Sequence, residues 1–359
     1  MDDTLKTARE TIERIDREMA ALFSERMPAV IAAYKEEHGL PVEDKAREAE
    51  LIARNTALVP TAYRPYYNSF FSGMLTQSKR YQSLLLAGMR IAYSGVEGAF
   101  AHVAARRIFG GCETVSCPDF ATAYRRVETG ECSCAVLPIE NSYAGDVSVV
   151  MDLAFSGSLY VNAVIETKVT HNLLLKKGGR PKNVKTGVSH PQALEQCGDF
   201  LRRNGFKTLE YSNTALAAKF VAEECDDTFA AIGSENAAEN FGLDIAVRGI
   251  NSDKHNTTRF AVFSRVQNLP QPSDPDESSH FILVFTAKNE AGSLAQALNI
   301  IGAHDFNMRT LTSRPMKELI WNYYFYVEAD GNINSENGRS MLRELSAVCA
   351  KLKLVGSYK

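Results

Sequence analysis

The stretch Asn256-Thr257-Thr258-Arg259-Phe260 places two hydroxyl groups and a guanidinium at the start of an apolar run typical of a buried strand. A hydroxyl can donate a proton in a hydrogen bond, and a guanidinium can hold a carboxylate through two parallel hydrogen bonds. Such a combination is unusual for a purely structural turn. The stretch therefore predicts a site for a small anionic substrate.

Three other polar clusters are expected where strands end. They are Glu140-Asn141-Ser142, Thr170-His171-Asn172 and Ser189-His190-Pro191-Gln192. Taken singly, each is more often a helix cap or a turn than a site. Because ligands of α/β sheets bind beyond the carboxyl ends of the strands, the convergence of these clusters favours one shared site. The turn Ser94 to Gly98 lacks a full G-x-G-x-x-G pattern, so we expect no dinucleotide cofactor.

Alternating strand and helix patterns from residue 88 to residue 268 predict an α/β domain with a mostly parallel sheet. Two such blocks, joined through residues 160–175, predict two lobes with a ligand cleft between them. Proline and polar residues at Pro270 to Pro275 predict a linker. Beyond it, over 278–359, the order strand, helix, strand, strand, helix, strand predicts an antiparallel sheet with helices on one face.

Residues 1–87 are predicted to form three helices. The apolar stripe of the first helix carries Arg9 and Arg26, and the third helix places Ser78 and Gln82 in its apolar face. A guanidinium inside a bundle is costly unless it meets an anion, although each arginine alone could extend to solvent or pair with a carboxylate. Three such helices cannot bury all their apolar surface, so we predict a homodimer or a homotetramer.

Composition indicates a soluble globular protein, since 45% of its 359 residues are hydrophobic and 23% are charged. A formal net charge of −3 argues against nucleic acid or an anionic membrane as a partner. The acidic N-terminus does not match a signal peptide, and no apolar run has the length of a spanning helix, so we expect a cytoplasmic location. The seven cysteines lack zinc-ligand spacing, so we expect reduced thiols and no metal.

From Met89 to about Val266 the chain resembles the prephenate dehydratases. The motifs that carry the resemblance are Leu137-Pro138-Ile139-Glu140-Asn141-Ser142, Ser189-His190-Pro191-Gln192-Ala193-Leu194, Ala230-Ala231-Ile232-Gly233 and Asn256-Thr257-Thr258-Arg259-Phe260. The resemblance implies a two-lobed fold like that of periplasmic binding proteins. It also implies that prephenate loses carbon dioxide and water together and becomes phenylpyruvate.

By position, Thr258 is the family's catalytic threonine, which we expect to relay a proton to the leaving hydroxyl from Glu140 or His190. Arg259 is expected to hold a carboxylate or to fix the loop. Phe260 is expected to form an apolar wall that excludes water. The residues predicted to bind the substrate of the dehydratase are Asn141, Ser142, Thr170, His190, Gln192, Thr257, Arg259 and Phe260.

The helical part resembles the all-helical chorismate mutase domains. The positions that match that family's site are Arg9, Arg26, Asp44, Arg47, Glu48, Ser78 and Gln82, with Lys35 as the catalytic lysine. A pericyclic rearrangement needs only a clamp for two carboxylates and donors at the breaking ether oxygen, here Lys35 and Gln82. Arg26 and Lys35 are nine positions apart in this chain, with Pro28 between them, whereas about eleven would return a helix to the same face. A degenerate domain that only dimerises is therefore the alternative.

Residues 278–359 resemble the ACT domain, a small regulatory module that binds amino acids. The motifs for phenylalanine binding fall at Gly292-Ser293-Leu294-Ala295 and Thr312-Ser313-Arg314-Pro315, which makes Gly292, Ser293, Leu294, Ser313 and Arg314 the predicted effector residues. The resemblance implies feedback control by phenylalanine, whose carboxylate would meet free amides at a helix start. A plain turn and packing edge is the alternative, because the usual acidic residue is replaced by Thr312.

Two other classes of protein fit the sequence less well. A solute receptor would share the two-lobed α/β pattern, but it would leave the Thr258 and Arg259 combination unexplained. A transcriptional regulator needs a DNA-reading helix with a basic face, whereas the N-terminal helices carry mixed charge. The sequence therefore predicts an enzyme of phenylalanine biosynthesis that acts on chorismate and prephenate without a cofactor.

Overall fold

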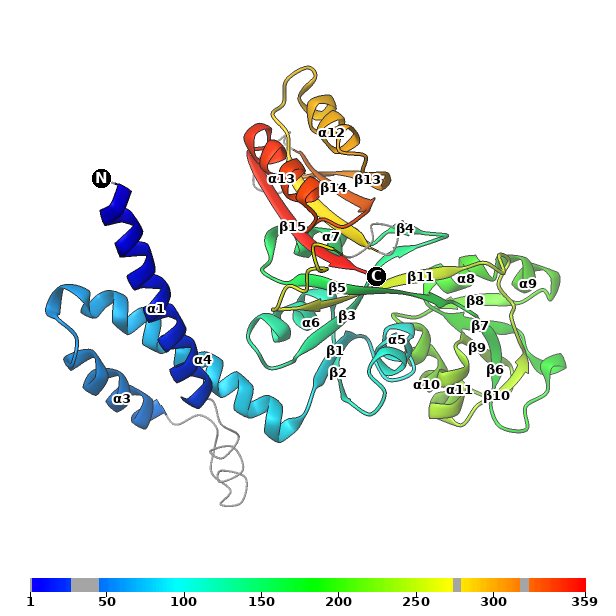
Figure 1. Cartoon of the computed structure of the whole chain (residues 1–359). Coiled ribbons are helices and arrows are strands. Elements are labelled where there is room, and N and C mark those ends of the chain that lie inside the picture. The colour runs from blue at the N-terminus through cyan, green and yellow to red at the C-terminus, as the bar shows by residue number, and fades with distance from the viewer. Residues whose placement is uncertain (1, 27–44, 274–278, 317–322) are drawn as a thin grey trace. The chain divides into compact units, whose positions relative to one another are not determined.

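The computed structural model describes residues 2–26, 45–273, 279–316 and 323–359 (Figure 1). The chain divides into two compact units, Met1–Met89 and Arg90–Lys359. This division lies close to the predicted boundary after residue 87. Within the described ranges, no helix is both long and apolar enough to cross a lipid bilayer.

The first unit is helical, as predicted. Its elements are α1 (Asp2–Arg26), α3 (Lys45–Ala57), a 3₁₀ turn (Thr61–Tyr63) and α4 (Arg64–Ala87). Helix α4 buries Phe71, and its Lys79 forms a salt bridge of 2.9 Å with Glu48 of α3. Helix α1 meets α4 where the guanidinium of Arg26 lies 5.9 Å from the ring centroid of Phe71.

The apolar stripe of α1 is exposed in the single chain. Its members are Leu5, Ile12, Ile15, Met19, Leu22 and Phe23. The least covered of them, Leu22, retains 64% of its accessible surface. The three helices thus leave an apolar face uncovered, as the sequence pattern predicted.

The first lobe of the second unit is built on a sheet whose strand order is β5-β11-β3-β1-β2. Its elements are β1 (Arg90–Ser94), α5 (Phe100–Ile108), β2 (Glu113–Cys117), α6 (Phe120–Glu128), β3 (Cys134–Asn141), β4 (Gly145–Asp146), α7 (Ser148–Ser156), β5 (Tyr160–Lys168) and β11 (Thr257–Ser264). Strands β1, β2 and β3 are parallel, whereas β11 runs antiparallel between β3 and β5. Helix α5 packs on one face, and α6 and α7 pack on the other.

The second lobe has its own sheet, with strand order β10-β6-β9-β7-β8. Its elements are β6 (Asn172–Leu175), a 3₁₀ turn (Pro181–Asn183), β7 (Thr186–Ser189), α8 (Pro191–Gln196), α9 (Gly198–Arg203), β8 (Lys207–Glu210), α10 (Thr214–Glu224), β9 (Phe229–Gly233), α11 (Glu235–Phe241) and β10 (Asp244–Val247). Helices α8 and α9 are divided at Cys197, whose ψ of 12° interrupts the helical backbone.

Each lobe's sheet has one strand that runs against the other four, β11 in the first lobe and β6 in the second, so each sheet is mostly parallel, as predicted, but mixed. In the second lobe, β6 is antiparallel to β9 and β10. The reason is topological, because the chain passes between the lobes through residues 168–172 and returns through residues 248–256. A strand that enters from the other lobe runs against strands whose connections stay within the lobe.

The C-terminal part has the predicted βαββαβ order. Its elements are β12 (His280–Thr286), α12 (Ser293–Ala303), β13 (Met308–Pro315), β14 (Tyr323–Asp330), α13 (Glu336–Val348) and β15 (Lys351–Tyr358). Helices α12 and α13 cover one face of its antiparallel sheet (Figure 1). The opposite face, including Ile282 and Val284, packs into the core of the first lobe. Burial on both faces explains the uninterrupted apolar run of β12.

The C-terminal sheet joins the first lobe at β15, which pairs in parallel with β5 through Gly356 and Val161. A Cβ atom at Gly356 would overlap the backbone of Val161, so only glycine allows this approach. The ammonium of Lys353 donates hydrogen bonds to the carbonyls of Ala154 and Gly157 at the end of α7, at 2.7 and 2.5 Å. The C-terminal part therefore contacts the first lobe both by pairing with β5 and by hydrogen bonds to the end of α7.

Candidate functional site

Thr258 and Asn141 face each other across two paired strands. They are register partners in β11 and β3, and Asn141 Nδ2 donates a hydrogen bond of 2.8 Å to Thr258 Oγ1. Thr258 retains 8% of its accessible surface. The predicted catalytic hydroxyl therefore lies at the edge of a core rather than on a free loop.

The amide of Asn141 can take only one orientation. Its Oδ1 accepts hydrogen bonds from the backbone N–H groups of Tyr143 and Ala144, at 3.1 and 2.9 Å. The Nδ2 group must then be the side that faces Thr258 and Asn256. Because Thr258 Oγ1 accepts from this amide, its own hydrogen stays available for another acceptor. A hydroxyl that already accepts a hydrogen bond is also the stronger donor.

The network continues from Asn256 into the second lobe. Asn256 Nδ2 donates to Oε1 of Gln196 at 2.9 Å, and Nε2 of His171 lies 2.9 Å from the same oxygen. All of these side chains are buried. Burial lowers the pKa of His171 to about 4, so its ring is neutral near pH 7. Sequence reasoning missed Gln196, although its place in the helix after Ser189-His190-Pro191-Gln192 was a signal that could have found it.

Two predicted residues brace the loop beside the threonine. Ser142 Oγ accepts a hydrogen bond of 3.0 Å from the N–H of Thr257, and the hydroxyl of Thr257 donates to the carbonyl of His255. At the start of α8, Nδ1 of His190 accepts a hydrogen bond from the N–H of Gln192, which is a helix cap. His190 thus acts as a helix cap, which is the alternative to a role in the site, and this contact does not link it to Thr258.

Arg259 and Glu140 lie on the sheet face opposite to Thr258, because successive side chains of a strand alternate between faces. Arg259 Nη1 donates to Glu140 at 3.0 Å, and both Nη groups donate to Glu328 of β14, at 3.0 and 2.6 Å. The prediction that Glu140 supplies a proton to Thr258 is therefore corrected. The same geometry directs Arg259 toward the C-terminal part and away from the threonine.

Phe260 shares the face of Thr258 but lies deeper in the sheet. It is almost fully buried, in a cluster with Ile91, Tyr93 and Val136 beneath α5. A side chain in this place supports the sheet below the site. The structure thus gives no open wall at Phe260.

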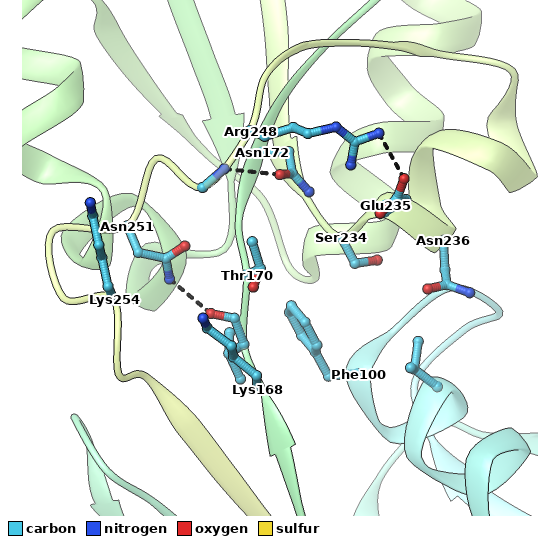
Figure 2. Close-up of a pocket in the computed structure, with 13 residues that line it drawn as sticks. Phe100, Lys168, Thr170, Asn172, Ser234, Glu235, Asn236, Arg248, Asn251 and Lys254 are labelled. Atoms are coloured by element: carbon cyan, nitrogen blue, oxygen red, sulfur yellow. Dashed lines mark hydrogen bonds and ion pairs between the residues drawn. The ribbon is translucent and has the colours of Figure 1, made fainter.

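A cavity of about 500 Å³ lies where the two lobes join (Figure 2). It is lined by the two segments that connect the lobes, residues 168–172 and 248–256, and by the starts of α5 and α11. Thr170 lines it, as do Lys168 and Lys254, whereas Arg248 is paired with Glu235 at 2.8 Å. Of the predicted dehydratase residues, Thr170 lines this cavity and the others lie elsewhere. Through Phe100, whose ring meets that of His171 edge-on, the cavity adjoins the buried network.

The predicted mutase residues are only partly described. Lys35 and Asp44 lie outside the described residues, and Gln82 belongs to α4 but its side chain is not among those described. Arg9 and Arg47 are exposed, Arg26 is partly covered, and Ser78 is buried in α4. Glu48 accepts the salt bridge from Lys79. The described side chains do not by themselves assemble a closed site.

The predicted effector residues follow β12 or lie near the end of β13, and β14 places these two strand ends at the same edge of the C-terminal sheet. Gly292 has a positive φ of 85° and precedes α12, which begins with Ser293 and Leu294. On β13, Ser313 is exposed. Arg314 points instead toward the first lobe, where it pairs with Asp152 of α7 at 3.3 Å.

Comparisons with known proteins agree with this geometry. The model of the family described as Prephenate dehydratase matches residues 91–268, and the one described as Chorismate mutase type II matches residues 8–83. The bifunctional chorismate mutase/prephenate dehydratase of Escherichia coli (strain K12) is 30% identical over 375 residues, covering 99% of this chain and 96% of that protein.

Two solved structures are similar to the second unit. One is GqqA, described as a novel type of quorum quenching acylase, with 29% identity, a TM-score of 0.69, and coverage of 75% of this chain and 97% of that chain. The other is the prephenate dehydratase from Arthrobacter aurescens in complex with L-Phe, with 24% identity, a TM-score of 0.70, and coverage of 75% and 90%. The two family matches and the relative that spans both of them show that the chain belongs to the family of bifunctional chorismate mutase/prephenate dehydratases.

Proposed function

We propose that the chain carries out two consecutive reactions of phenylalanine biosynthesis, chorismate to prephenate in the helical unit and prephenate to phenylpyruvate in the two-lobed part. The observation that carries the second reaction is the hydroxyl of Thr258, oriented by Asn141 so that its hydrogen is free. The family membership supports both reactions.

In the dehydratase reaction, the bond between the ring and its carboxylate breaks, and the carboxylate leaves as carbon dioxide. Its electron pair enters the ring, which becomes aromatic as the carbon–oxygen bond to the hydroxyl breaks. The departing hydroxide takes one proton and leaves as water. Thr258 donates the hydrogen bond through which that proton arrives, and solvent supplies the proton that the net reaction consumes.

The buried amide network fixes this donor in place. Hydrogen bonds join Thr258 to Asn141, Asn141 to Asn256, and Asn256 to Gln196 of the second lobe. A donor that is oriented before the substrate binds needs no reorganisation during the reaction. The test is incubation of purified protein with prephenate: equal yields of phenylpyruvate and carbon dioxide support the proposal, and unchanged prephenate refutes it.

For the mutase reaction, we assign the carboxylate clamp to Arg9, Arg26 and Arg47, and the donors at the ether oxygen to Lys35 and Gln82. Asp44, Glu48 and Ser78 complete the assigned site. Consumption of chorismate by the purified chain supports the assignment. If chorismate is not consumed while prephenate is, the degenerate and dimerising domain is the correct alternative.

The exposed apolar stripe of α1 supports a homodimer. Burial of a large aliphatic or aromatic side chain contributes roughly 1.5–3 kcal/mol, so six exposed ones form a strong driving force for association. A second copy of the same stripe would be a self-complementary partner. Sedimentation equilibrium tests this: a Leu22→Glu variant should shift toward monomer, and a monomeric wild-type chain refutes the dimer.

The C-terminal part, with its βαββαβ order, is proposed to be an ACT domain that binds phenylalanine as an inhibitor. Gly292, Ser293 and Leu294 would receive the amino acid's carboxylate on the amides at the start of α12. Ser313 lies exposed on β13 and is available to a ligand, whereas Arg314 would act through Asp152. Calorimetry with phenylalanine checks this proposal, and absence of binding heat together with unchanged dehydratase rates contradicts it.

A further inference from the structure

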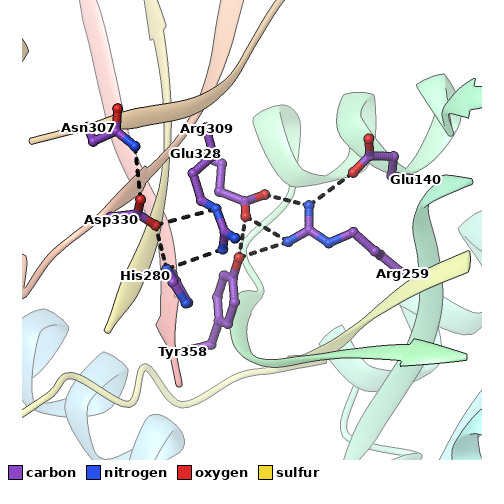
Figure 3. A network of polar contacts seen from close by, with 8 residues as sticks. All are labelled: Glu140, Arg259, His280, Asn307, Arg309, Glu328, Asp330 and Tyr358. Carbon is purple, nitrogen blue, oxygen red and sulfur yellow. Dashed lines mark hydrogen bonds and ion pairs between the residues drawn. The ribbon is translucent and has the colours of Figure 1, made fainter. Parts of the chain in front are cut away.

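Arg259 is held by four hydrogen bonds, and three of them come from the C-terminal part (Figure 3). Its Nη1 group donates to Glu140 and Glu328, and its Nη2 group donates to Glu328 and to the hydroxyl of Tyr358. Every Nη hydrogen is therefore engaged. The guanidinium has no Nη donor left for a substrate carboxylate.

The Glu328 carboxylate is buried, since its side chain retains 2% of its accessible surface. It accepts hydrogen bonds from Arg259 and from the Tyr358 hydroxyl. Burial opposes the charge on Arg259, but the hydrogen bond and charge of Glu328, together with the hydrogen bond to Glu140, raise its pKa above the ordinary value. The guanidinium of Arg259 therefore carries its positive charge at neutral pH.

A buried ion pair of this kind contributes little net stability compared with apolar side chains of the same size, because desolvation offsets the attraction. Its geometry, however, is strict, since a guanidinium and a carboxylate meet through two parallel hydrogen bonds. The pair is therefore better suited to setting a position than to stabilising the fold. What it positions is the backbone of β11 at residue 259, one peptide bond away from Thr258.

The C-terminal side of this pair is anchored in turn. The ring of Tyr358 lies 5.2 Å from that of His280, and Nδ1 of His280 lies 2.8 Å from Asp330 (Figure 3). Asp330 also meets Arg309 of β13 at 3.4 Å and accepts a hydrogen bond from Asn307 at 3.0 Å. The carboxylate that binds Arg259 therefore belongs to a connected cluster on all four strands of the C-terminal sheet.

The segment that follows Asn141 is held from the same side. Thr312 donates to Asp146 at 2.8 Å, and Tyr324 donates to Asp152 of α7 at 2.6 Å. Thr258 on β11 and Asn141 on β3 are register partners, and each lies close in sequence to residues that the C-terminal part binds. The distance between Thr258 and Asn141 therefore depends on both sets of contacts.

We propose that Glu328, with Tyr358, is a positioning residue for the dehydratase reaction: it holds Arg259 and thereby fixes the placement of Thr258 against Asn141. This inference rests on the proposed function of Thr258 as the proton-donating group. It assigns to the C-terminal part a role in the chemistry itself, in the absence of any effector.

The test is a double-mutant cycle between Glu328→Gln and Thr258→Ala, measured as kcat and KM for phenylpyruvate formation. Glu328→Gln keeps the volume and removes the charge, and we expect kcat to fall about tenfold to a hundredfold with KM changed less than about threefold, as for a misplaced catalytic group. In the Thr258→Ala background the same substitution should cause no further loss, because residues that act as one unit are non-additive. The exposed Glu290, in the loop before α12, gives the matched control Glu290→Gln, which should leave kcat unchanged.

Additive losses in the cycle, or a normal kcat in Glu328→Gln, would overturn the proposal. Tyr358→Phe, which removes one hydroxyl, should lower kcat by a smaller factor in the same cycle and serves if Glu328→Gln does not fold. A wild-type chain that forms no phenylpyruvate would instead contradict the proposed function. The two failures are therefore distinguishable.

Discussion

Replacing Asn141 by aspartate should reverse the hydrogen bond on which the proposed mechanism depends. The new carboxylate keeps an oxygen for the N–H groups of Tyr143 and Ala144, and aspartate is common in such turns, so the loop should survive. In place of the Nδ2 donor it presents an acceptor to Thr258 Oγ1, now 2.8 Å away. The threonine hydrogen will then point at residue 141 instead of at the substrate.

The magnitude follows from the hydrogen bonds that the substitution removes. Removing one oriented donor from a reacting group typically lowers kcat about 10²–10³-fold, which corresponds to about 2.7–4 kcal/mol. The new oxygen would also face Oδ1 of Asn256 at 2.9 Å, and that amide cannot rotate without losing its bond to Gln196. An unsatisfied buried polar group costs roughly 1–3 kcal/mol, so the unfolding free energy should fall by a similar amount.

The assay is the initial rate of phenylpyruvate formation across a pH series, with thermal unfolding followed in parallel. Burial raises the pKa of the introduced carboxyl, and its protonated form can donate again, so the residual kcat of Asn141→Asp should rise as the pH falls. Asn162→Asp is the matched control, because Asn162 on β5 also donates twice through Nδ2, to Ser264 and Val266, outside the site. A folded Asn141→Asp enzyme with wild-type kcat would refute the assigned direction of the hydrogen bond.

Two further predictions concern the seam between the C-terminal sheet and the first lobe. Gly356→Ala should destabilise the second unit by about 1–3 kcal/mol, as overpacking does, because a Cβ there overlaps the backbone of Val161; denaturant unfolding measures this, and an unchanged midpoint would argue against the β15–β5 pairing. Burial, with a smaller contribution from Lys351, lowers the pKa of Lys353 to about 8 from 10.5. Between these values the unfolded chain binds more protons, so Lys353 makes the unfolding free energy rise with pH, and Lys353→Met should remove that rise. An equal slope in both proteins would contradict the burial of this ammonium.

Local patterns were sufficient to predict most elements but not their pairing. The start of α10 follows from the cap at Asn213, whose side chain accepts hydrogen bonds from the N–H groups of Ala215 and Leu216, and such a cap is a property of a short segment. The direction of β11 between β3 and β5 depends on where the chain crosses between lobes, and no local pattern records that crossing.

The site shows the same division between local and long-range information. Asn141 and Thr258 were identified from their motifs, whereas Gln196 was missed because its role depends on a contact made 60 positions along the chain, with Asn256. The role of Arg259 could have been predicted better, because strand alternation alone places it on the face opposite to Thr258. Its partner Glu328 lies in another part of the chain, so only the structure identifies it.

The proposed mechanism requires that the hydroxyl of Thr258 delivers the proton to the departing hydroxide of prephenate. The most direct measurement compares kcat for phenylpyruvate formation in Thr258→Ala and Thr258→Ser, with Thr257→Ala as a control on the neighbouring hydroxyl. We expect a loss of at least about a hundredfold in Thr258→Ala, on the scale of lost acid assistance, and substantial recovery in Thr258→Ser, with the fold intact in both. A near-normal kcat in Thr258→Ala would contradict the claim and remove Thr258 from the mechanism.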